Sequence, residues 1–298
     1  MIQFVSTCTD RKTASPAIHA RDLTATTPRE RADEWVAAIE KLPGGRSARD
    51  TYAGEMARVA VAAAERDNLR HLICSAGYGL IDASTRIAGY SATFNAPHAD
   101  EVTGAPKQPT ARRDWWKTLR RSLSVGAPSL DSLGREGPIL LAASPNYLDA
   151  MHDELVAGVA SGATVIVVTS RRIRGQLADV LVPVTGRISG VLGGSMMSIN
   201  LRVAARIMDE LPEGRLNVEN AREVVARLTA DAPVAKKFDR RPLSDDEVVD
   251  FILRQLGDDR SLSHSRLLRL LRSSGFACEQ ARFKSLYSLA SSSLPSVP

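Results

Sequence analysis

Four short apolar runs along the chain predict strands that are buried on both faces. The runs are continuous rather than alternating, each is followed by Gly, Ser or Thr, and they cover residues 2–6, 71–75, 138–143 and 163–169. Continuous apolar runs of this length are typical of parallel strands, because helices cover both faces of a parallel sheet. The pattern therefore predicts the core of an α/β domain.

Helical patterns lie between these runs. Residues 52–66 are rich in Ala with the charges on one side, and a second helical pattern covers residues 147–159. Ser144 and Pro145 predict the start of the second helix, since Ser is a favoured N-cap and Pro is favoured at the first helical position. Strands that alternate with helices predict an open, mostly parallel sheet flanked by helices, with right-handed crossovers.

Residues 97–138 interrupt this alternation with a stretch that contains Pro and Gly and a basic helical pattern at 112–121. Trp115 and Trp116 lie in that pattern and could form a binding surface of rings among cations. Adjacent Trp residues more often anchor a helix to a core, and we expect that role here.

The second half of the chain contains a Gly-rich segment at 186–195, a helical pattern at 196–211 and a polar stretch at 232–242 that is bounded by prolines. Polar segments of this kind are typical of linkers. We therefore divide the chain into an α/β domain at 1–229, a linker at 230–243 and a small helical domain at 244–293.

The small helical domain has the outline of a helix-turn-helix module. Ser244 and Glu247 have the spacing of a capping box at the start of its first helix, and Gly275 ends the second. A helix, a tight turn and a basic helix within sixty residues are typical of DNA-binding modules. The cations expected to contact DNA in this domain are Arg266, Arg269, Arg272, Arg282 and Lys284.

The charge balance agrees with an anionic partner. The 298-residue chain has a formal net charge of +5, and residues 260–287 alone hold six cations and one anion. Each arginine that neutralises a phosphate releases a counterion, which gives affinity without reading sequence. Double-stranded DNA is therefore the expected partner, and a solvated face on a helical protein-interaction domain is the alternative.

Several other classes of protein are disfavoured. The three cysteines are far apart and odd in number, which argues against a disulfide framework and favours a reducing cytoplasm. No apolar stretch reaches the length of a membrane span, and the N-terminus lacks the order of a signal peptide. The histidines are dispersed, which predicts no metal site. The chain lacks a phosphate-binding loop, a GxGxxG motif and a GxSxG motif, and we expect no cofactor. We also expect no membrane partner, since no apolar stretch is long enough to span one.

The strongest candidate for chemistry is the polar cluster that follows the first apolar run. Cys8 and Thr9 precede Asp10, and Arg11 and Lys12 follow it. Ligands of α/β sheets bind beyond the carboxyl ends of the strands, so Asp10 is the candidate catalytic residue, Cys8 and Thr9 are expected to contact substrate, and the two cations are expected to contact DNA. The alternative is a carboxylate that caps a turn, with solvated cations beside it.

Aromatic and amide side chains follow the second strand. Tyr78 stands between two glycines, and Tyr90, Phe94 and Asn95 follow within a short segment. Rings at such a position could stack on a flipped base, and an amide could hydrogen-bond its edge. Each of these residues would also serve as ordinary turn or core.

Two further segments could hold anionic groups. Ser144 and Asn146 lie at the start of a helix, where free N–H groups attract anions, and they are expected to contact substrate. The Gly-rich segment could lie against phosphates because its backbone is unencumbered. Its residues expected to contact DNA are Arg187, Gly193, Gly194 and Ser195.

The motifs CTDRK after the first strand, SAGYGLI after the second and the following GYSATF resemble a small prokaryotic branch of the uracil-DNA glycosylase-like superfamily. This branch is similar to the YaaA-like proteins and to the glycosylase-like domain of archaeosine synthases. Together with its basic C-terminal module, the chain most resembles anti-phage DNA glycosylases that remove glucosylated hydroxymethylcytosine. The resemblance covers about the first two-thirds of the chain through short motifs.

The resemblance implies a metal-free base excision in which Asp10 occupies the place of the superfamily's acidic residue. Arg11 and Lys12 replace the proline and tyrosine that usually follow it, and no His-Ser-Pro type motif is visible near the fourth strand. The expected activity is hydrolysis of an N-glycosidic bond in modified DNA that leaves an abasic site. The alternative is a non-catalytic DNA-binding regulator that senses a nucleotide or sugar phosphate.

Overall fold

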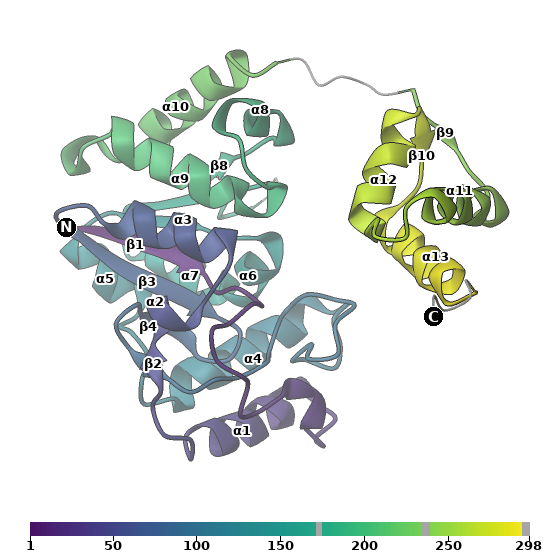
Figure 1. Cartoon of the computed structure of the whole chain (residues 1–298). Coiled ribbons are helices and arrows are strands. Elements are labelled where there is room, and N and C mark those ends of the chain that lie inside the picture. Colours follow the sequence, from purple (N-terminus) through teal and green to yellow (C-terminus); the bar gives the residue numbers. More distant parts are fainter. Residues whose placement is uncertain (171–174, 234–238, 294–298) are drawn as a thin grey trace. The chain divides into compact units, whose positions relative to one another are not determined.

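The computed structural model describes residues 1–170, 175–233 and 239–293, and the chain divides into two compact units. Unit 1 is Met1–Pro233 and unit 2 is Val234–Pro298 (Figure 1). In the described part of the chain, no helix has both the length and the apolar character needed to cross a membrane.

Unit 1 is built on a six-stranded sheet with the order β4-β3-β1-β6-β7-β8. All neighbouring strands are parallel except β4, which is antiparallel to β3. The strands are β1 (Ile2–Thr7), β3 (Leu69–Ser75), β4 (Gly79–Asp82), β6 (Ile139–Ala142), β7 (Val165–Thr169) and β8 (Leu181–Pro183). The α/β class with an open, mostly parallel sheet flanked by helices is confirmed.

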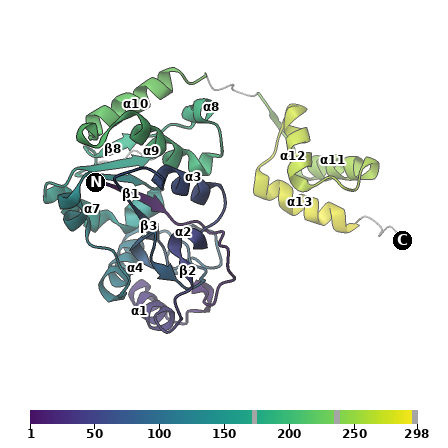
Figure 2. The ribbon, with the colours of Figure 1, turned by 60° about the vertical axis from the view of Figure 1, so that its left-hand side comes forward.

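Helices cover both faces of this sheet (Figure 2). One face packs against α3 (Glu55–Ala64), α9 (Ile199–Glu210) and α10 (Val218–Ala230). The other face packs against α4 (Pro109–Ser122), α5 (Leu130–Glu136), α6 (Pro145–Ala150) and α7 (His152–Ala160), and α1 (Pro28–Ile39) lies outside α4.

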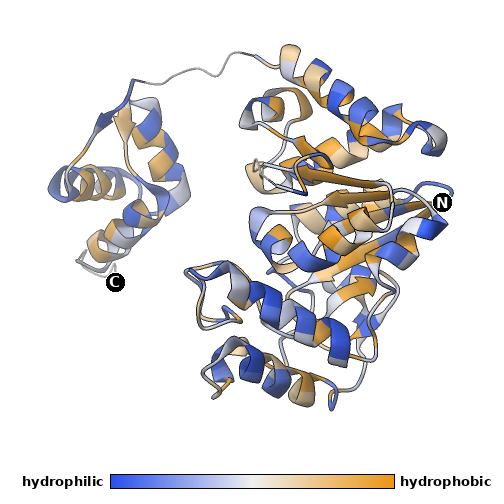
Figure 3. Cartoon of the chain, turned by 180° about the vertical axis from the view of Figure 1, so that it is seen from behind, coloured by the Kyte–Doolittle hydropathy of each residue, from blue (hydrophilic) through white to orange (hydrophobic). Residues whose placement is uncertain are grey.

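The strands are mostly apolar because alternate residues enter different cores. Phe4 and Leu140 belong to the core under α3, α9 and α10, whereas Val5 and Leu141 belong to the core on the opposite face. The strands accordingly form a hydrophobic layer between helices with polar outer faces (Figure 3).

All four predicted strands are present, and the helix at 112–121 is α4. Trp115 and Trp116 anchor it to the core, since their side chains are 0% and 3% exposed. The single helix predicted at 147–159 is wrong, because the chain breaks at Met151 into α6 and α7.

The remaining elements of unit 1 are short. They are β2 (Arg46–Ser47), α2 (Ala48–Thr51), β5 (Arg86–Ile87) and α8 (Ser189–Leu192), with 3-10 turns at Ala20–Asp22, Gly186–Ile188, Met196–Ser198 and Glu213–Arg215. β2 pairs antiparallel with β5, which brings α2 close to the start of α3.

Unit 2 is a three-helix unit around a core of its own. It contains β9 (Arg241–Pro242), α11 (Asp245–Asp258), α12 (His264–Ser273), β10 (Phe276–Ala277) and α13 (Gln280–Ser293). The capping box of Ser244 and Glu247 is confirmed, with both of its hydrogen bonds present. Val248, Leu267 and Phe283 are fully buried in its core.

The predicted linker at 230–243 includes residues 234–238, which lie outside the described part of the chain, and its two ends differ from the prediction. Ala230 still belongs to α10, and Arg241–Pro242 pairs in parallel with Phe276–Ala277. Leu243 is buried in the core of unit 2. The polar composition and flanking prolines did not indicate the two-residue strand β9, because its pairing partner β10 lies more than thirty residues later in the sequence.

Candidate functional site

The site lies at the topological switch point of the sheet, where the strand order changes direction. β1 is flanked by β3 on one side and by β6 on the other, so the crossovers that leave β1 and β3 run in opposite directions. In open α/β sheets, ligands bind in the crevice that this reversal opens at the carboxyl ends of the strands. Two segments leave the sheet there: the first loop, residues 8–13 after β1, and residues 143–147 after β6.

Asp10 lies in the first loop, and 63% of its side chain is exposed. His98 lies beside it, with Nε2 3.7 Å from Asp10 Oδ1. The backbone N–H of Asp100 donates to His98 Nδ1 at 3.0 Å. A neutral ring that accepts at Nδ1 carries its proton at Nε2, so the proton faces the Asp10 carboxylate.

Lys12 is held over the same loop. Its Nζ lies 4.3 Å from the centroid of the Tyr90 ring and donates to the carbonyl oxygens of Asp10 at 3.2 Å and Thr9 at 3.3 Å. The ring face and the two carbonyl dipoles hold the Lys12 side chain over the loop. The site therefore contains an exposed carboxylate with a fixed cation behind it.

A layer of buried hydroxyl and thiol groups supports this loop. Tyr90 Oη is 2.6 Å from Ser75 Oγ and 2.9 Å from Tyr52 Oη, and Cys8 Sγ is 2.9 Å from Tyr147 Oη. Burial raises the pKa of Tyr52, Tyr90 and Tyr147 well above their ordinary range. These groups stay neutral and hold the loop in place without adding charge.

Two amides face the site from adjoining segments. Asn146 Nδ2 donates to Asn95 Oδ1 at 2.9 Å and to the Phe94 carbonyl at 3.3 Å. Both amide hydrogens of Asn146 are used in this way. Asn146 Oδ1 is left as an acceptor and Asn95 Nδ2 as a donor, the pair of groups needed to bind a base edge.

The segment that carries His98 and Asn95 is tied down by Asp100. This carboxylate is fully buried and accepts hydrogen bonds from Arg21 Nε at 2.9 Å, Arg21 Nη2 at 2.7 Å and Ser91 Oγ at 2.7 Å. Burial alone would raise the pKa of Asp100, but the bonds from Arg21 and Ser91 hold it well below its usual range. Asp100 is therefore a charged anchor for residues 91–101.

The structure places His98 beside Asp10, Lys12 over the first loop and Asn146 in hydrogen-bond contact with Asn95, and it changes the expected role of the rings. Tyr78, Tyr90 and Phe94 are 6%, 1% and 0% exposed, so the prediction that they stack directly on a base does not hold here. Their faces pack in an aromatic core with Trp35 and Tyr147, and Lys12 covers Tyr90.

Other predicted contact residues are engaged within the fold. Cys8 and Thr9 are 8% and 9% exposed, and Thr9 Oγ1 donates to the Arg11 carbonyl. Ser144 caps α6 through its backbone, while its side chain makes no capping bond. Arg11 is an exposed residue of the first loop. Sequence reasoning missed His98, Asp100 and the contact of Lys12 with Tyr90, because they depend on a loop whose path no local pattern reveals.

The Gly-rich segment does not form an open phosphate cradle. The Ser195 N–H donates to Glu55 Oε1 at 3.0 Å, and Ser198 Oγ and Arg202 bind the same oxygen. Gly193 and Gly194 have φ values of +65° and +73°, and a Cβ at Gly194 would lie 2.2 Å from the Arg202 guanidinium. A carboxylate thus occupies the place expected for a phosphate, and Arg187 Nη2 donates to the Ala232 carbonyl.

The contacts of Glu55 with Ser195, Ser198 and Arg202, which anchor the Gly-rich segment, can be tested by their dependence on pH. The bonds from the Ser195 N–H and the Arg202 guanidinium lower the pKa of Glu55 from 4.5 to about 2. The stabilisation is complete above the unfolded pKa near 4.5 and is lost as the pH falls toward 2. We expect Glu55→Gln to be less stable than the wild type at pH 6 and the difference to shrink by pH 2.5, measured by urea unfolding through Trp fluorescence.

The exposed Glu219 on α10 supplies the matched control. Glu219→Gln is expected to follow the wild-type stability at both pH values. An equal stability of Glu55→Gln and wild type at pH 6 would contradict the anchor.

In unit 2 the predicted DNA-contacting cations divide into two groups. Arg266, Arg269 and Lys284 are exposed. Arg272 Nη2 donates to the Cys278 carbonyl at 3.0 Å, and Arg282 bonds Asp245 and the Leu243 carbonyl. These two arginines hold the turn and α13 in place. They are only partly exposed, and we assign them a structural role rather than phosphate contacts.

Arg269 and Arg272 also line a hollow of about 700 Å³ in unit 2, together with Arg240, Ser265 and Gln280. Asp239 lies in the same lining. Arg272 is bonded to the Cys278 carbonyl and Arg240 Nε donates to the Arg272 carbonyl, so two of the three arginines are engaged within unit 2.

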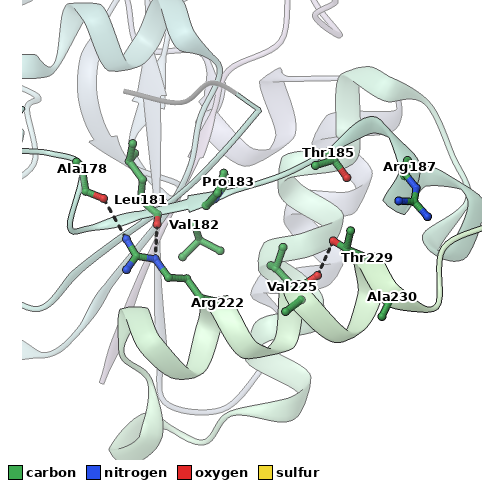
Figure 4. A pocket seen from close by; sticks show the side chains of 11 residues that line it. Ala178, Leu181, Val182, Pro183, Thr185, Arg187, Arg222, Val225, Thr229 and Ala230 are labelled. Carbon is green, nitrogen blue, oxygen red and sulfur yellow. Dashed lines mark hydrogen bonds between the residues drawn. The ribbon is translucent and has the colours of Figure 1, made fainter. Parts of the chain in front are cut away.

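A hollow of about 820 Å³ lies between β8 and α10 (Figure 4). It is lined mainly by apolar side chains, and Arg222 in its wall donates to the carbonyls of Leu181, Ala178 and Asp179. β8 is separated from β1 by two strands, so this hollow does not belong to the Asp10 site. The arginine and Pro183 cover the open side of the edge strand, which prevents pairing with a further strand.

Comparisons with protein-family models, with curated proteins and with solved structures found no match. Within the described ranges, no group of three or more His, Cys, Asp or Glu side chains is arranged to hold a metal ion.

Proposed function

We propose that this protein is a DNA glycosylase that hydrolyses the N-glycosidic bond of a modified base in duplex DNA. The observation that carries the proposal is the exposed Asp10 carboxylate at the reversal point of the sheet, 3.7 Å from His98 and beside Lys12. The resemblance of the CTDRK and SAGYGLI motifs adds the substrate, glucosylated hydroxymethylcytosine in phage DNA, and a role in anti-phage defence.

Asp10 has the position needed for the chemical step. Cleavage of an N-glycosidic bond passes through a sugar cation, which a nearby carboxylate stabilises. Asp10 also accepts a hydrogen bond from water, which adds to C1′ of the sugar while the base leaves with the bonding electrons and takes up a proton. His98 Nε2 lies 3.7 Å from the Asp10 carboxylate, and the Lys12 ammonium is held on the backbone of the same loop by the carbonyls of Asp10 and Thr9.

The amide pair provides the contacts for the base. A base in a duplex must be flipped out before an enzyme can reach its glycosidic bond. Asn95 Nδ2 offers a donor to a carbonyl of the flipped base, and Asn146 Oδ1 offers an acceptor. A donor at this place also stabilises charge that develops on the leaving base.

Unit 2 supplies sequence-independent affinity for the duplex through Arg266 and Arg269. We expect the double variant Arg266→Ala/Arg269→Ala to weaken binding to all duplexes alike and to lower the slope of log affinity against log salt by up to about two units. Fluorescence anisotropy with duplexes of different sequence measures this result. A loss confined to one sequence would instead indicate base readout.

Strand breakage separates the enzyme from a regulator. The protein is incubated with glucosylated, hydroxymethylated and plain duplexes, which are then heated in alkali. The glycosylase predicts breaks at modified cytosines. If DNA of every kind stays intact and a small molecule changes operator affinity, the non-catalytic regulator is supported. The structure disfavours that alternative, because the Ser195 N–H that could bind a phosphate already donates to Glu55.

A further inference from the structure

We infer that unit 1 has a DNA-backbone site of its own, in a groove beside the first loop that the sequence did not indicate. The inference rests on the proposed function and names the surface that holds the strand carrying the target base. The arginine groove is the hollow lined by Arg46, Arg49 and Arg58, and its volume is about 700 Å³.

The groove adjoins Asp10 through two backbone contacts. Tyr52 and Ala53 line it. Lys12 pairs with Tyr52 as an antiparallel bridge, and the Ala53 N–H donates to the Arg11 carbonyl at 2.9 Å. A strand in the groove would therefore continue directly into the loop that carries Asp10.

The walls and floor suit a sugar-phosphate chain. Arg46 and Arg49 come from β2 and α2, whereas Arg58 comes from α3, so cations approach the groove from two segments. All three arginines are exposed. The floor is made by small or apolar side chains at helical spacing on α3, namely Ala57, Val61 and Ala62.

The lining also contains two acidic residues, Asp50 and Glu65, but three arginines outnumber them. Asp50 Oδ2 accepts from Ser47 Oγ at 2.5 Å, and its Oδ1 is 3.9 Å from Arg49 Nε, so its charge is already partly neutralised. Glu65 is the other acidic lining residue and follows the last residue of α3. Arg11 and Lys12 add two cations where the groove meets the first loop.

The part of the groove that follows α3 matches a few nucleotides. Its lining residues there extend from Ala57 to Glu65, about 12 Å at 1.5 Å per residue. A DNA strand carries one phosphate per about 3.4 Å of helix axis, so about three phosphates fit along this part. Contacts at this place would fix the register of the strand relative to Asp10, which lies in the adjoining loop.

The test is the full-length triple variant Arg46→Ala/Arg49→Ala/Arg58→Ala, titrated against a plain labelled duplex at several salt concentrations. Loss of three phosphate contacts is expected to lower the slope of log affinity against log salt by about two to three units. The matched control Arg29→Ala/Arg121→Ala/Arg215→Ala removes the same charge from exposed positions outside the groove and is expected to keep the wild-type slope. A thermal melt confirms that both variants are folded.

The outcomes separate this inference from the glycosylase proposal. An unchanged slope in the groove variant, with modified DNA still cleaved by wild type, would overturn the groove and leave the enzyme. An altered slope with no base release by wild type would support the groove and contradict the glycosylase. Equal losses in the groove and control variants would show that only net charge matters, which also overturns the groove.

Discussion

Replacing Asp10 by Asn is expected to slow base release by about 100- to 1,000-fold, because the amide cannot stabilise the sugar cation. The measurement is single-turnover cleavage of a duplex with one modified base, at saturating protein. Asp10 is 63% exposed and has no buried partner, so the variant should fold normally and bind DNA at least as well as wild type.

Asp33→Asn is the control for this experiment, because it removes an exposed carboxylate on α1, away from the first loop. Its cleavage rate is expected to equal that of wild type. If folded Asp10→Asn cleaves at the wild-type rate, the carboxylate is not the catalytic group.

Asp100→Asn is expected to destabilise unit 1 by about 2–3 kcal/mol, since removing one partner from a buried ion pair leaves the other uncompensated. The value lies at the low end of the usual range because Arg21 is half exposed. A domain of this size should then melt roughly 5–10 °C lower, measured by circular dichroism at pH 7.

Because the pKa of Asp100 is lowered, the stability that its ion pair contributes depends on pH. Its stabilisation is present above the unfolded pKa of 3.8 and declines as the pH falls below it. Asp209→Asn breaks an exposed pair with Arg66 and should leave the melting temperature within about 2 °C of wild type. An equally small effect of Asp100→Asn would refute its role as the anchor of the His98 segment.

The sheet was predictable from sequence because its physical signal is local. The runs that contain Phe4, Leu140 and Ile166 are mostly apolar, since each strand is buried on both faces. The capping box at Ser244 is also a local signal. β8 was missed because it is only three residues long and includes Pro183.

The site was predictable only in part. Asp10, Lys12 and Asn146 could be found because each directly follows a recognisable strand. His98 lies within a polar segment whose fold is decided by a distant ion pair, from Arg21 to Asp100, and no local pattern predicts that pairing. Tyr78 and Phe94 also look available in the sequence, but they are buried in a core formed with residues from distant parts of the chain.

The most direct test of the glycosylase is the identity of the product. Wild-type protein is incubated with DNA that contains glucosylated hydroxymethylcytosine, and the low-molecular-weight fraction is analysed by mass spectrometry. The proposal predicts the free glucosylated base, with one abasic site left in the DNA for each base released, and almost none from Asp10→Asn. Complete recovery of the modified nucleoside within intact DNA, under conditions where the protein binds that DNA, would contradict it.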